Sequence, residues 1–131
     1  GEHEKSFAEG MERRHKGVVS VIGRMSMSQE MDLIGNLDAI VTMDSATMHI
    51  ASLLGIPVVS VWGATHPFAG FYGYGQHPDN AVQADLPCRP CSVFGDRPCI
   101  SGDYRCLSSI RPQEIADRVA KAVAAQKSDR R

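Results

Sequence analysis

AIVTMDSATMHIASLLGIPVVSVWG, from Ala39 to Gly63, is the stretch that decides the fold. It opens with a short apolar run at 39–43, continues as a helical pattern at 45–55 that ends in glycine, and returns to a β-branched run at 57–63. Apolar strands joined by a helix through short connections are typical of a parallel sheet with helices on both faces. We therefore predict a strand, a helix and a second strand of an α/β fold.

The sequence before this stretch continues the alternation of helices and strands. We expect a helix at 2–17 and a buried strand at 18–23, where VVSVIG is rich in β-branched residues. A second helix should begin at the capping box that Ser26 forms with Gln29.

The C-terminal third adds two further elements to the predicted fold. AVQAD at 81–85 predicts a short strand, and RPQEIADRVAKAVAAQ at 111–126 predicts an amphipathic final helix with Pro112 in its first turn. The tail KSDRR at 127–131 is expected to fray.

Length and composition exclude several classes of protein. The 131 residues suffice for one domain with a real core, and the 43% of hydrophobic and 22% of charged residues are typical of a globular chain. The net charge of −1 argues against a nucleic-acid-binding protein. No apolar run approaches the roughly 18 residues that cross a bilayer, and no signal peptide is recognisable. Because the sequence starts in a helical pattern without Met, we expect a piece of a longer protein, with 1–131 forming a single domain.

Polar residues gather where the first strand of the quoted stretch meets its helix. Ligands of open parallel sheets bind at the carboxyl ends of strands, where helix N-termini attract anions. Ala46 and Thr47 are small enough to let a phosphate approach this backbone. His49 could donate a further hydrogen bond, and Asp44 could bind sugar hydroxyls. The alternative is structural: Asp44 or Ser45 caps the helix, and His49 packs against it.

Two loops follow the strand at 57–63. The loop at 64–80 is rich in glycine and aromatic residues, and the loop at 88–106 contains all four cysteines. Thr65 and His66 could face a bound donor or acceptor at the same edge of the sheet, with the aromatic side chains shaping the site. Alternatively, the aromatic side chains pack the loop onto the domain.

The four cysteines have the spacing C-x2-C-x7-C-x6-C, at Cys88, Cys91, Cys99 and Cys106. Four thiolates could hold a structural zinc ion tetrahedrally, and the close first pair is typical of a zinc knuckle. The wide second pair is not, so disulfide bonds and free thiols stay open as alternatives. A redox-catalytic role is not expected, because the surrounding sequence is not thioredoxin-like.

Several motifs together resemble the heptosyltransferase family (glycosyltransferase family 9). DSATMHIASLLGIPVVSVWG at 44–63 is similar to the family signature, which has Asp, Ser or Thr, a small residue, His, and then an apolar strand ending in Gly. GEHE at 1–4 is similar to the family's Gly-x-x-Glu segment, and SMSQEMDLIGNLDAIVTMD at 26–44 matches the helix and strand before the signature. CRPC at 88–91 and CLSSIRPQEI at 106–115 look like the Cys-containing variant of the family.

This resemblance implies a GT-B fold, in which two Rossmann-like domains flank the active site. The chain would be most of the C-terminal domain, which binds the nucleotide sugar. The phosphates of ADP-heptose would lie on the helix that opens at 45–47, with His49 touching a phosphate. Asp44 would hold the donor near its phosphate or sugar, and Glu4 would hold the ribose hydroxyls.

The implied activity is inverting transfer of heptose from ADP-heptose to a lipopolysaccharide core acceptor, with no cofactor required. The catalytic base is an Asp of the missing N-terminal domain, so this chain alone should bind the donor weakly and catalyse nothing. The bacterial enzyme would be cytoplasmic and would meet its lipid-linked saccharide acceptor at the inner membrane face. The alternatives are a GT-B transferase that uses another nucleotide sugar, and a non-catalytic four-cysteine zinc-binding interaction module.

Overall fold

The structure, a computed structural model, describes residues 1–129. The chain divides into two compact units: an N-terminal unit, Gly1–Leu33, and a sheet unit that begins at Ile34. The expectation that residues 1–131 form one domain stays a prediction. Among the described residues, no helix combines the length and the apolar character needed to cross a bilayer.

The N-terminal unit contains one whole helix and most of a second, both expected from the sequence. Helix α1 spans Glu2–Arg14 and so ends three residues before the predicted stop, and α2 spans Met27–Gly35 across the boundary of the units. The predicted capping box is confirmed. The backbone N–H of Ser26 donates to Oε1 of Gln29 over 2.9 Å, and the N–H of Gln29 donates to Oγ of Ser26 over 3.4 Å.

The buried strand predicted at 18–23 is wrong. These residues form no strand, and Val19 is 70% exposed. The physical reason is that β-branched residues favour a strand only where a neighbouring strand supplies hydrogen bonds and packing. Residues 1–33 contain no strand, so this segment has no partner within its own unit.

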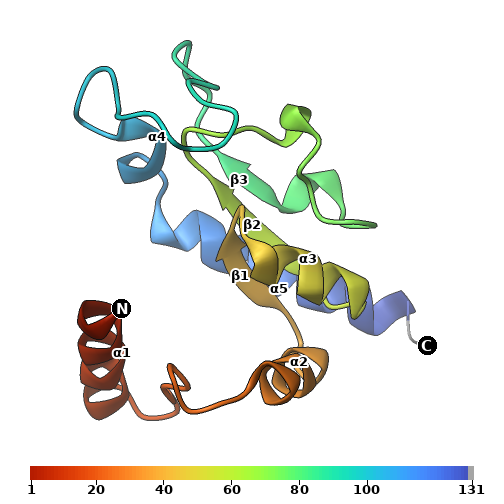
Figure 1. The fold of residues 1–131 in the computed structure, drawn as a ribbon. Helices are drawn as coiled ribbons and strands as arrows, with labels where there is room; N and C mark the ends of the chain where they lie inside the picture. Colours follow the sequence, from red (N-terminus) through yellow and green to blue (C-terminus); the bar gives the residue numbers. More distant parts are fainter. Residues whose placement is uncertain (130–131) are drawn as a thin grey trace. The chain divides into compact units, whose positions relative to one another are not determined.

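The sheet unit holds a three-stranded parallel sheet in the order β1-β2-β3. Strand β1 spans Ile40–Met43, β2 spans Val58–Trp62 and β3 spans Ala81–Gln83, as the sequence predicts. Val59 pairs with Val41 on one side of β2, and Val61 pairs with Val82 on the other. Helix α3, Ala46–Leu53, connects β1 to β2 and confirms the predicted strand–helix–strand unit (Figure 1).

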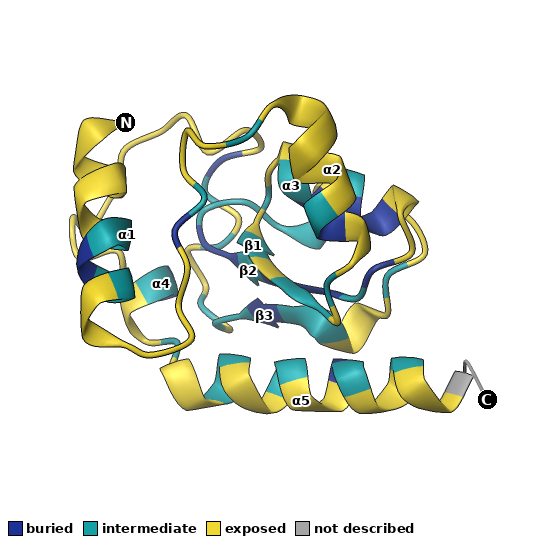
Figure 2. Ribbon diagram, turned by 90° about the horizontal axis from the view of Figure 1, so that it is seen from below, coloured by how far each residue is buried: buried dark blue, intermediate teal, exposed yellow. Residues whose placement is uncertain are grey.

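Alternation along β2 directs side chains to two hydrophobic clusters on opposite faces of the sheet. Val58 and Trp62 join the cluster with Met48 and Ala51 of α3. On the other face, Val59 packs with Val82 of β3 and Ala122 of α5, a helix that spans Pro112–Asp129. Figure 2 shows α5 with its half-buried side toward the sheet and its exposed side away from it. The Rossmann-like α/β fold with helices on both faces is thus confirmed.

The connecting segments are mostly irregular. Two 3-10 turns, η1 (Pro67–Ala69) and η2 (Pro78–Asn80), lie in the loop at 64–80. A short helix, α4 (Arg105–Ser108), begins at the end of the cysteine loop at 88–106 and includes Cys106. The tail was expected to fray from Lys127, but α5 continues to Asp129. Arg130 and Arg131 lie outside the described residues.

Candidate functional site

The junction between β1 and α3 leaves the first turn of the helix without a side-chain cap. Ser45 is the N-cap residue and is extended (φ −154°, ψ 167°), but its side chain makes no capping hydrogen bond. Its hydroxyl lies instead 2.9 Å from the hydroxyl of Thr42 on β1. The first N–H groups of α3 therefore remain available to an external acceptor, and the helix dipole adds partial positive charge there.

The predicted phosphate-binding residues surround this helix start. Asp44 and Thr47 are half-buried, whereas Ser45, Ala46 and His49 are exposed. Within residues 1–129, the side chains of Asp44 and His49 have no hydrogen bond or ion pair. Ser45 thus occupies the N-cap position, as the alternative expects, but neither its side chain nor that of Asp44 makes a capping bond, and His49 is exposed.

A cavity of about 400 Å³ lies at the carboxyl ends of β1 and β2. Asp44 lines it at the end of β1, and Thr65 lines it just after β2. The opposite wall is the cysteine loop, which connects β3 to α4 in Figure 1. The cavity thus adjoins the helix start at one of its predicted donor residues, Asp44, and this edge of a parallel sheet is where ligands bind.

Comparison with known proteins identifies the family. The family model described as "Glycosyltransferase family 9 (heptosyltransferase)" matches residues 2–99, which is most of the chain. The chain belongs to glycosyltransferase family 9. The match includes Glu4 and the whole β1–α3 junction, and it ends at Cys99, before α4 and α5.

Three curated proteins are similar to parts of this chain. Lipooligosaccharide heptosyltransferase 2 of Haemophilus influenzae is 39% identical over 49 residues, 37% of this chain and 14% of the relative. Lipopolysaccharide heptosyltransferase 1 of Pseudomonas aeruginosa is 33% identical over 55% of this chain and 20% of the relative. Lipooligosaccharide heptosyltransferase 2 of Campylobacter jejuni is 26% identical over 64% of this chain and 25% of the relative. This chain thus spans at most a quarter of these relatives. No solved structure matches it.

Glu4, the predicted ribose-binding residue of the Gly-x-x-Glu segment, lies in the N-terminal unit. It occupies the first turn of α1, and its side chain is 75% exposed. The role of Glu4 toward a ribose stays a prediction.

Thr65 and His66 have different surroundings. Thr65 lines the cavity, but His66 does not. Nδ1 of His66 accepts the backbone N–H of Phe68 over 3.1 Å, and the two rings are 4.1 Å apart. Burial, together with the nearby charge of Arg89, lowers the pKa of His66. The structure therefore brings Thr65 to the candidate site and gives His66 a capping role in the turn η1.

Most aromatic side chains of the loop at 64–80 and the adjacent Trp62 pack onto the sheet unit. Trp62 is fully buried, and its Nε1 donates to Oγ of Ser60 over 2.8 Å. The Tyr72 hydroxyl donates to the backbone carbonyl of His77 over 2.7 Å, and its ring lies 6.1 Å from that of Trp62. Phe68 and Tyr74, by contrast, are 92% and 80% exposed. The packing alternative thus holds for Trp62 and Tyr72 but not for Phe68 or Tyr74.

Sequence reasoning missed Arg89, which connects the segments after β2 and β3 by hydrogen bonds. Its guanidinium donates to the backbone carbonyls of Gly63 (2.6 Å) and Thr65 (3.0 Å), after β2. It also donates to the carbonyl of Ala84 and, over 3.1 Å, to Oε1 of Gln83, both at the end of β3. Burial lowers the pKa of Arg89. The only sequence signal was its position between two cysteines in CRPC.

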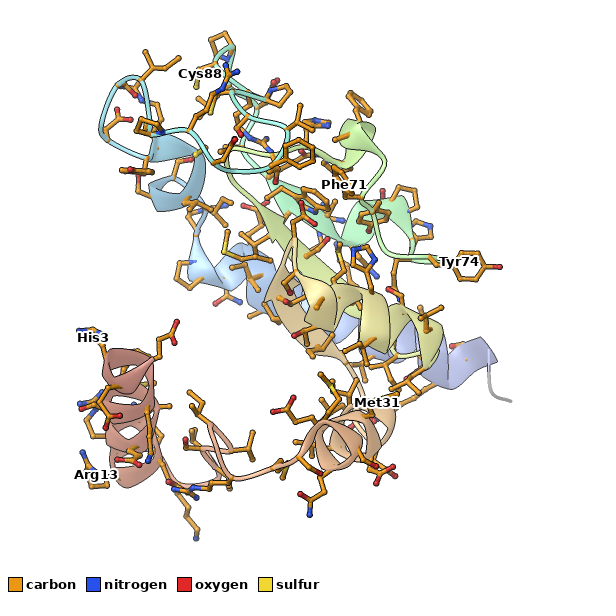
Figure 3. All side chains as sticks on the ribbon, viewed as in Figure 1. His3, Arg13, Met31, Phe71, Tyr74 and Cys88 are labelled. Atoms are coloured by element: carbon orange, nitrogen blue, oxygen red, sulfur yellow. The ribbon has the colours of Figure 1, made fainter. Side chains whose placement is uncertain are left out.

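None of the four cysteines forms a disulfide bond in the structure, and all four line the cavity. Cys88 is exposed and labelled in Figure 3, Cys91 and Cys99 are half-buried, and Cys106 is buried. Within the described part of the chain, no three His, Cys, Asp or Glu residues are already arranged to hold a metal ion. The zinc and disulfide alternatives therefore stay predictions.

A hydrogen-bonded turn closes the cysteine loop before α4. Asp103 accepts bonds from the Ser101 hydroxyl (2.7 Å) and from Nε of Arg105 (2.7 Å). The bond from Arg105, followed by that from Ser101, lowers the pKa of Asp103 strongly. Tyr104 lies between these partners with φ 47°, a left-handed conformation that is costly for a bulky residue. This turn gives the cavity a fixed polar rim.

Proposed function

We propose that this chain is the donor-binding part of an inverting glycosyltransferase that transfers heptose from ADP-heptose to a lipopolysaccharide core acceptor. The observation that carries the proposal is the uncapped start of α3, which has Asp44 and His49 beside it at the carboxyl edge of a parallel sheet. Family membership supports it, as do the heptosyltransferase names of the three relatives.

The chemistry of the leaving group fits the residues at this edge. Glycosyl transfer from a nucleotide sugar releases a diphosphate, whose phosphate oxygens gain negative charge in the transition state. The N–H groups of Ala46 and Thr47 face such an anion together with the helix dipole, and His49 adds a side-chain donor. No metal ion is needed for this stabilisation.

Asp44 has a different part in the proposal. A carboxylate repels a phosphate, but it accepts hydrogen bonds from sugar hydroxyls. Asp44 lines the cavity next to the helix start, so a sugar attached to the diphosphate would extend from α3 into the cavity. We assign the heptose to the Asp44 side and the diphosphate to the backbone of α3.

The other requirements of the reaction are assigned to the rest of the protein. The base that deprotonates the acceptor hydroxyl is an Asp of the N-terminal GT-B domain, so this chain contains no catalytic residue. The whole enzyme is cytoplasmic and meets its lipid-linked acceptor at the inner membrane face. ADP is the preferred nucleotide, and Glu4 holds its ribose.

Calorimetric titration of the full-length protein with ADP, UDP and ADP-heptose tests the assignment. His49→Ala should weaken ADP binding about tenfold, the effect of losing one hydrogen bond to a charged group. Asp44→Ala should leave ADP affinity nearly unchanged but should weaken ADP-heptose binding and reduce transfer strongly. The matched controls are His15→Ala and Asp38→Ala, on exposed positions outside the cavity.

Unchanged ADP affinity in His49→Ala would remove this histidine from the phosphate site. Equal affinity for ADP and UDP would contradict the base preference and favour a transferase with another nucleotide sugar. Unchanged turnover in Asp44→Ala would remove Asp44 from the sugar site. Circular dichroism of each variant separates these results from a loss of the fold.

A further inference from the structure

Three arginines line the cavity at the carboxyl edge of the sheet, and they differ in what they bind. Arg89 donates to backbone carbonyls at the ends of β2 and β3, and Arg105 forms an ion pair with Asp103 over 2.6 Å. Within residues 1–129, Arg97 forms no hydrogen bond and no ion pair. We propose that Arg97 binds an anionic group of the acceptor, a carboxylate or a phosphate, and so determines acceptor specificity. This inference rests on the proposed function.

The turn that precedes Arg97 is fixed to the end of β2. The backbone N–H groups of Cys91 and Ser92 both donate to the carbonyl of Ala64, over 3.1 and 3.4 Å. Ser92 is buried, and its hydroxyl donates to Oδ1 of Asp96 over 2.6 Å. The N–H of Asp96 donates back to Oγ of Ser92 over 3.2 Å. Arg97 therefore follows a turn that is held against the segment leaving β2.

The neighbouring carboxylate of Asp96 does not neutralise Arg97 by direct contact. The hydrogen bond from the Ser92 hydroxyl is the main cause that lowers the pKa of Asp96, followed by a backbone hydrogen bond, and the charge of Arg97 adds to them. Asp96 and Arg97 form no ion pair in the described part of the chain. The exposed guanidinium of Arg97 is thus available to an external anion.

The stereochemistry of the proposed reaction places the acceptor near the cysteine loop. In an inverting displacement, the acceptor hydroxyl attacks the sugar from the face opposite the departing group. The proposed diphosphate site is the start of α3, and the heptose would extend past Asp44 into the cavity. The cysteine loop, which carries Arg97 and connects β3 to α4 in Figure 1, forms the other wall. A group of the acceptor that lies beyond the heptose would therefore meet Arg97.

The remaining surface of this wall fits a saccharide better than a second diphosphate. Phe94 and Ile100 line the cavity although they are 76% and 90% exposed, so both present apolar surface to a ligand. Sugar rings pack their C–H faces against such surfaces. A guanidinium binds a carboxylate or a phosphate with two parallel hydrogen bonds. One unpaired cation beside apolar side chains is thus suited to an acidic sugar.

Steady-state kinetics of the full-length protein test the proposal, with ADP-heptose as donor and a deacylated lipopolysaccharide core saccharide as acceptor. Arg97→Ala should raise the acceptor KM about tenfold, the effect of losing one hydrogen bond to a charged group. It should leave kcat and ADP affinity nearly unchanged, because the lost contact is equal in the ground state and the transition state. Arg97→Lys should restore part of the acceptor affinity, since it keeps the charge without the bidentate geometry.

Modified acceptors identify the anion that Arg97 binds. Methyl esterification of the acceptor carboxyl groups tests a carboxylate, and enzymatic dephosphorylation tests a phosphate. One of the two modifications should raise the acceptor KM of the unsubstituted enzyme and have little further effect in Arg97→Ala, because the partner is already gone. Arg111→Ala is the matched control, since Arg111 is exposed and lies outside the cavity, and its acceptor KM should be unchanged.

Three results would overturn the proposal. The first is an unchanged acceptor KM in Arg97→Ala. The second is a loss of ADP affinity in this variant with an unchanged acceptor KM, which would assign Arg97 to the donor diphosphate. The third is an equal rise of KM in Arg111→Ala, which would show a general effect of surface charge. An unsubstituted enzyme that neither binds ADP nor transfers heptose would contradict the proposed function itself, so the two failures are distinguishable.

Discussion

The hydroxyl of Ser45 lies 2.9 Å from the hydroxyl of Thr42, and Ser45 does not cap the helix that it precedes. Serine at an N-cap position ordinarily accepts a hydrogen bond from the second or third N–H of the helix. At the start of α3 the Ser45 side chain makes no such bond, whereas Ser26 accepts the N–H of Gln29. The same residue type thus precedes an uncapped helix start at Ser45 and forms a capping box at Ser26.

This difference predicts unequal costs for two serine substitutions. Ser45→Ala should lower the free energy of unfolding by less than about 0.5 kcal/mol, because no capping bond is lost. Ser26→Ala should cost about 1 kcal/mol, because Ser26 takes part in a true capping box. Urea unfolding of both variants makes the comparison. A loss of about 1 kcal/mol or more in Ser45→Ala would show that its hydroxyl caps α3 in solution.

Arg89 should be a major contributor to stability. Arg89→Lys keeps the positive charge, but one ammonium cannot serve four acceptors at the ends of two strands. We expect a loss of about 2–3 kcal/mol, the scale of hydrogen bonds to a charged group. Arg97→Lys, at an exposed position of the same cavity, is the control and should be nearly neutral. Equal denaturation midpoints for the two variants would contradict the structural role of Arg89.

The sequence predicted those parts of the fold that rest on local periodicity. The strands at 40–43 and 58–62 and the helix between them follow from the alternation of apolar runs with a helical pattern. The segment 18–23 has the same β-branched composition, but a strand also needs a partner, and composition does not supply one.

Local reasoning also placed Asp44 and His49 at a strand end, because the direction of a parallel strand fixes where its carboxyl end lies. It could not find Arg89, whose bond to Gly63 spans 26 residues, or the cavity, whose walls come from segments far apart in sequence. Whether the Ser45 side chain caps α3 could not be decided from the sequence, because it depends on the direction in which the Ser45 hydroxyl points.

Gly73 should tolerate no side chain, for steric reasons alone. A Cβ at this position would lie 2.4 Å from Oγ of Ser52 and 3.0 Å from Cγ of Gln76. We expect Gly73→Ala to lower stability by about 1–3 kcal/mol, the usual cost of overpacking. In Gly73→Ala combined with Ser52→Ala, the closest clash is gone, so the two effects should be clearly non-additive. Additive losses in thermal denaturation would exclude this contact as the cause.

The hydrogen bonds of the turn at 101–105 predict that the free energy of unfolding falls at acidic pH. Hydrogen bonds from Arg105 and Ser101 hold the folded pKa of Asp103 well below its unfolded value of about 3.9. A depressed folded pKa means that the unfolded state binds the proton more readily. The contribution of Asp103 is therefore fully present above about pH 5 and is lost as the pH falls through 4 toward the folded pKa.

Asp103→Asn should remove this part of the acid sensitivity, so that unfolding free energy falls less steeply below about pH 5. The control Asp38→Asn changes a carboxylate outside this hydrogen-bonded turn and should keep the steep fall. Because the Asp103 side chain is 39% exposed, high salt should weaken the effect by screening its attraction to Arg105. Urea titrations at several pH values measure the slope. If Asp103→Asn and the unsubstituted protein share one slope, the bonds to Asp103 contribute nothing to acid stability.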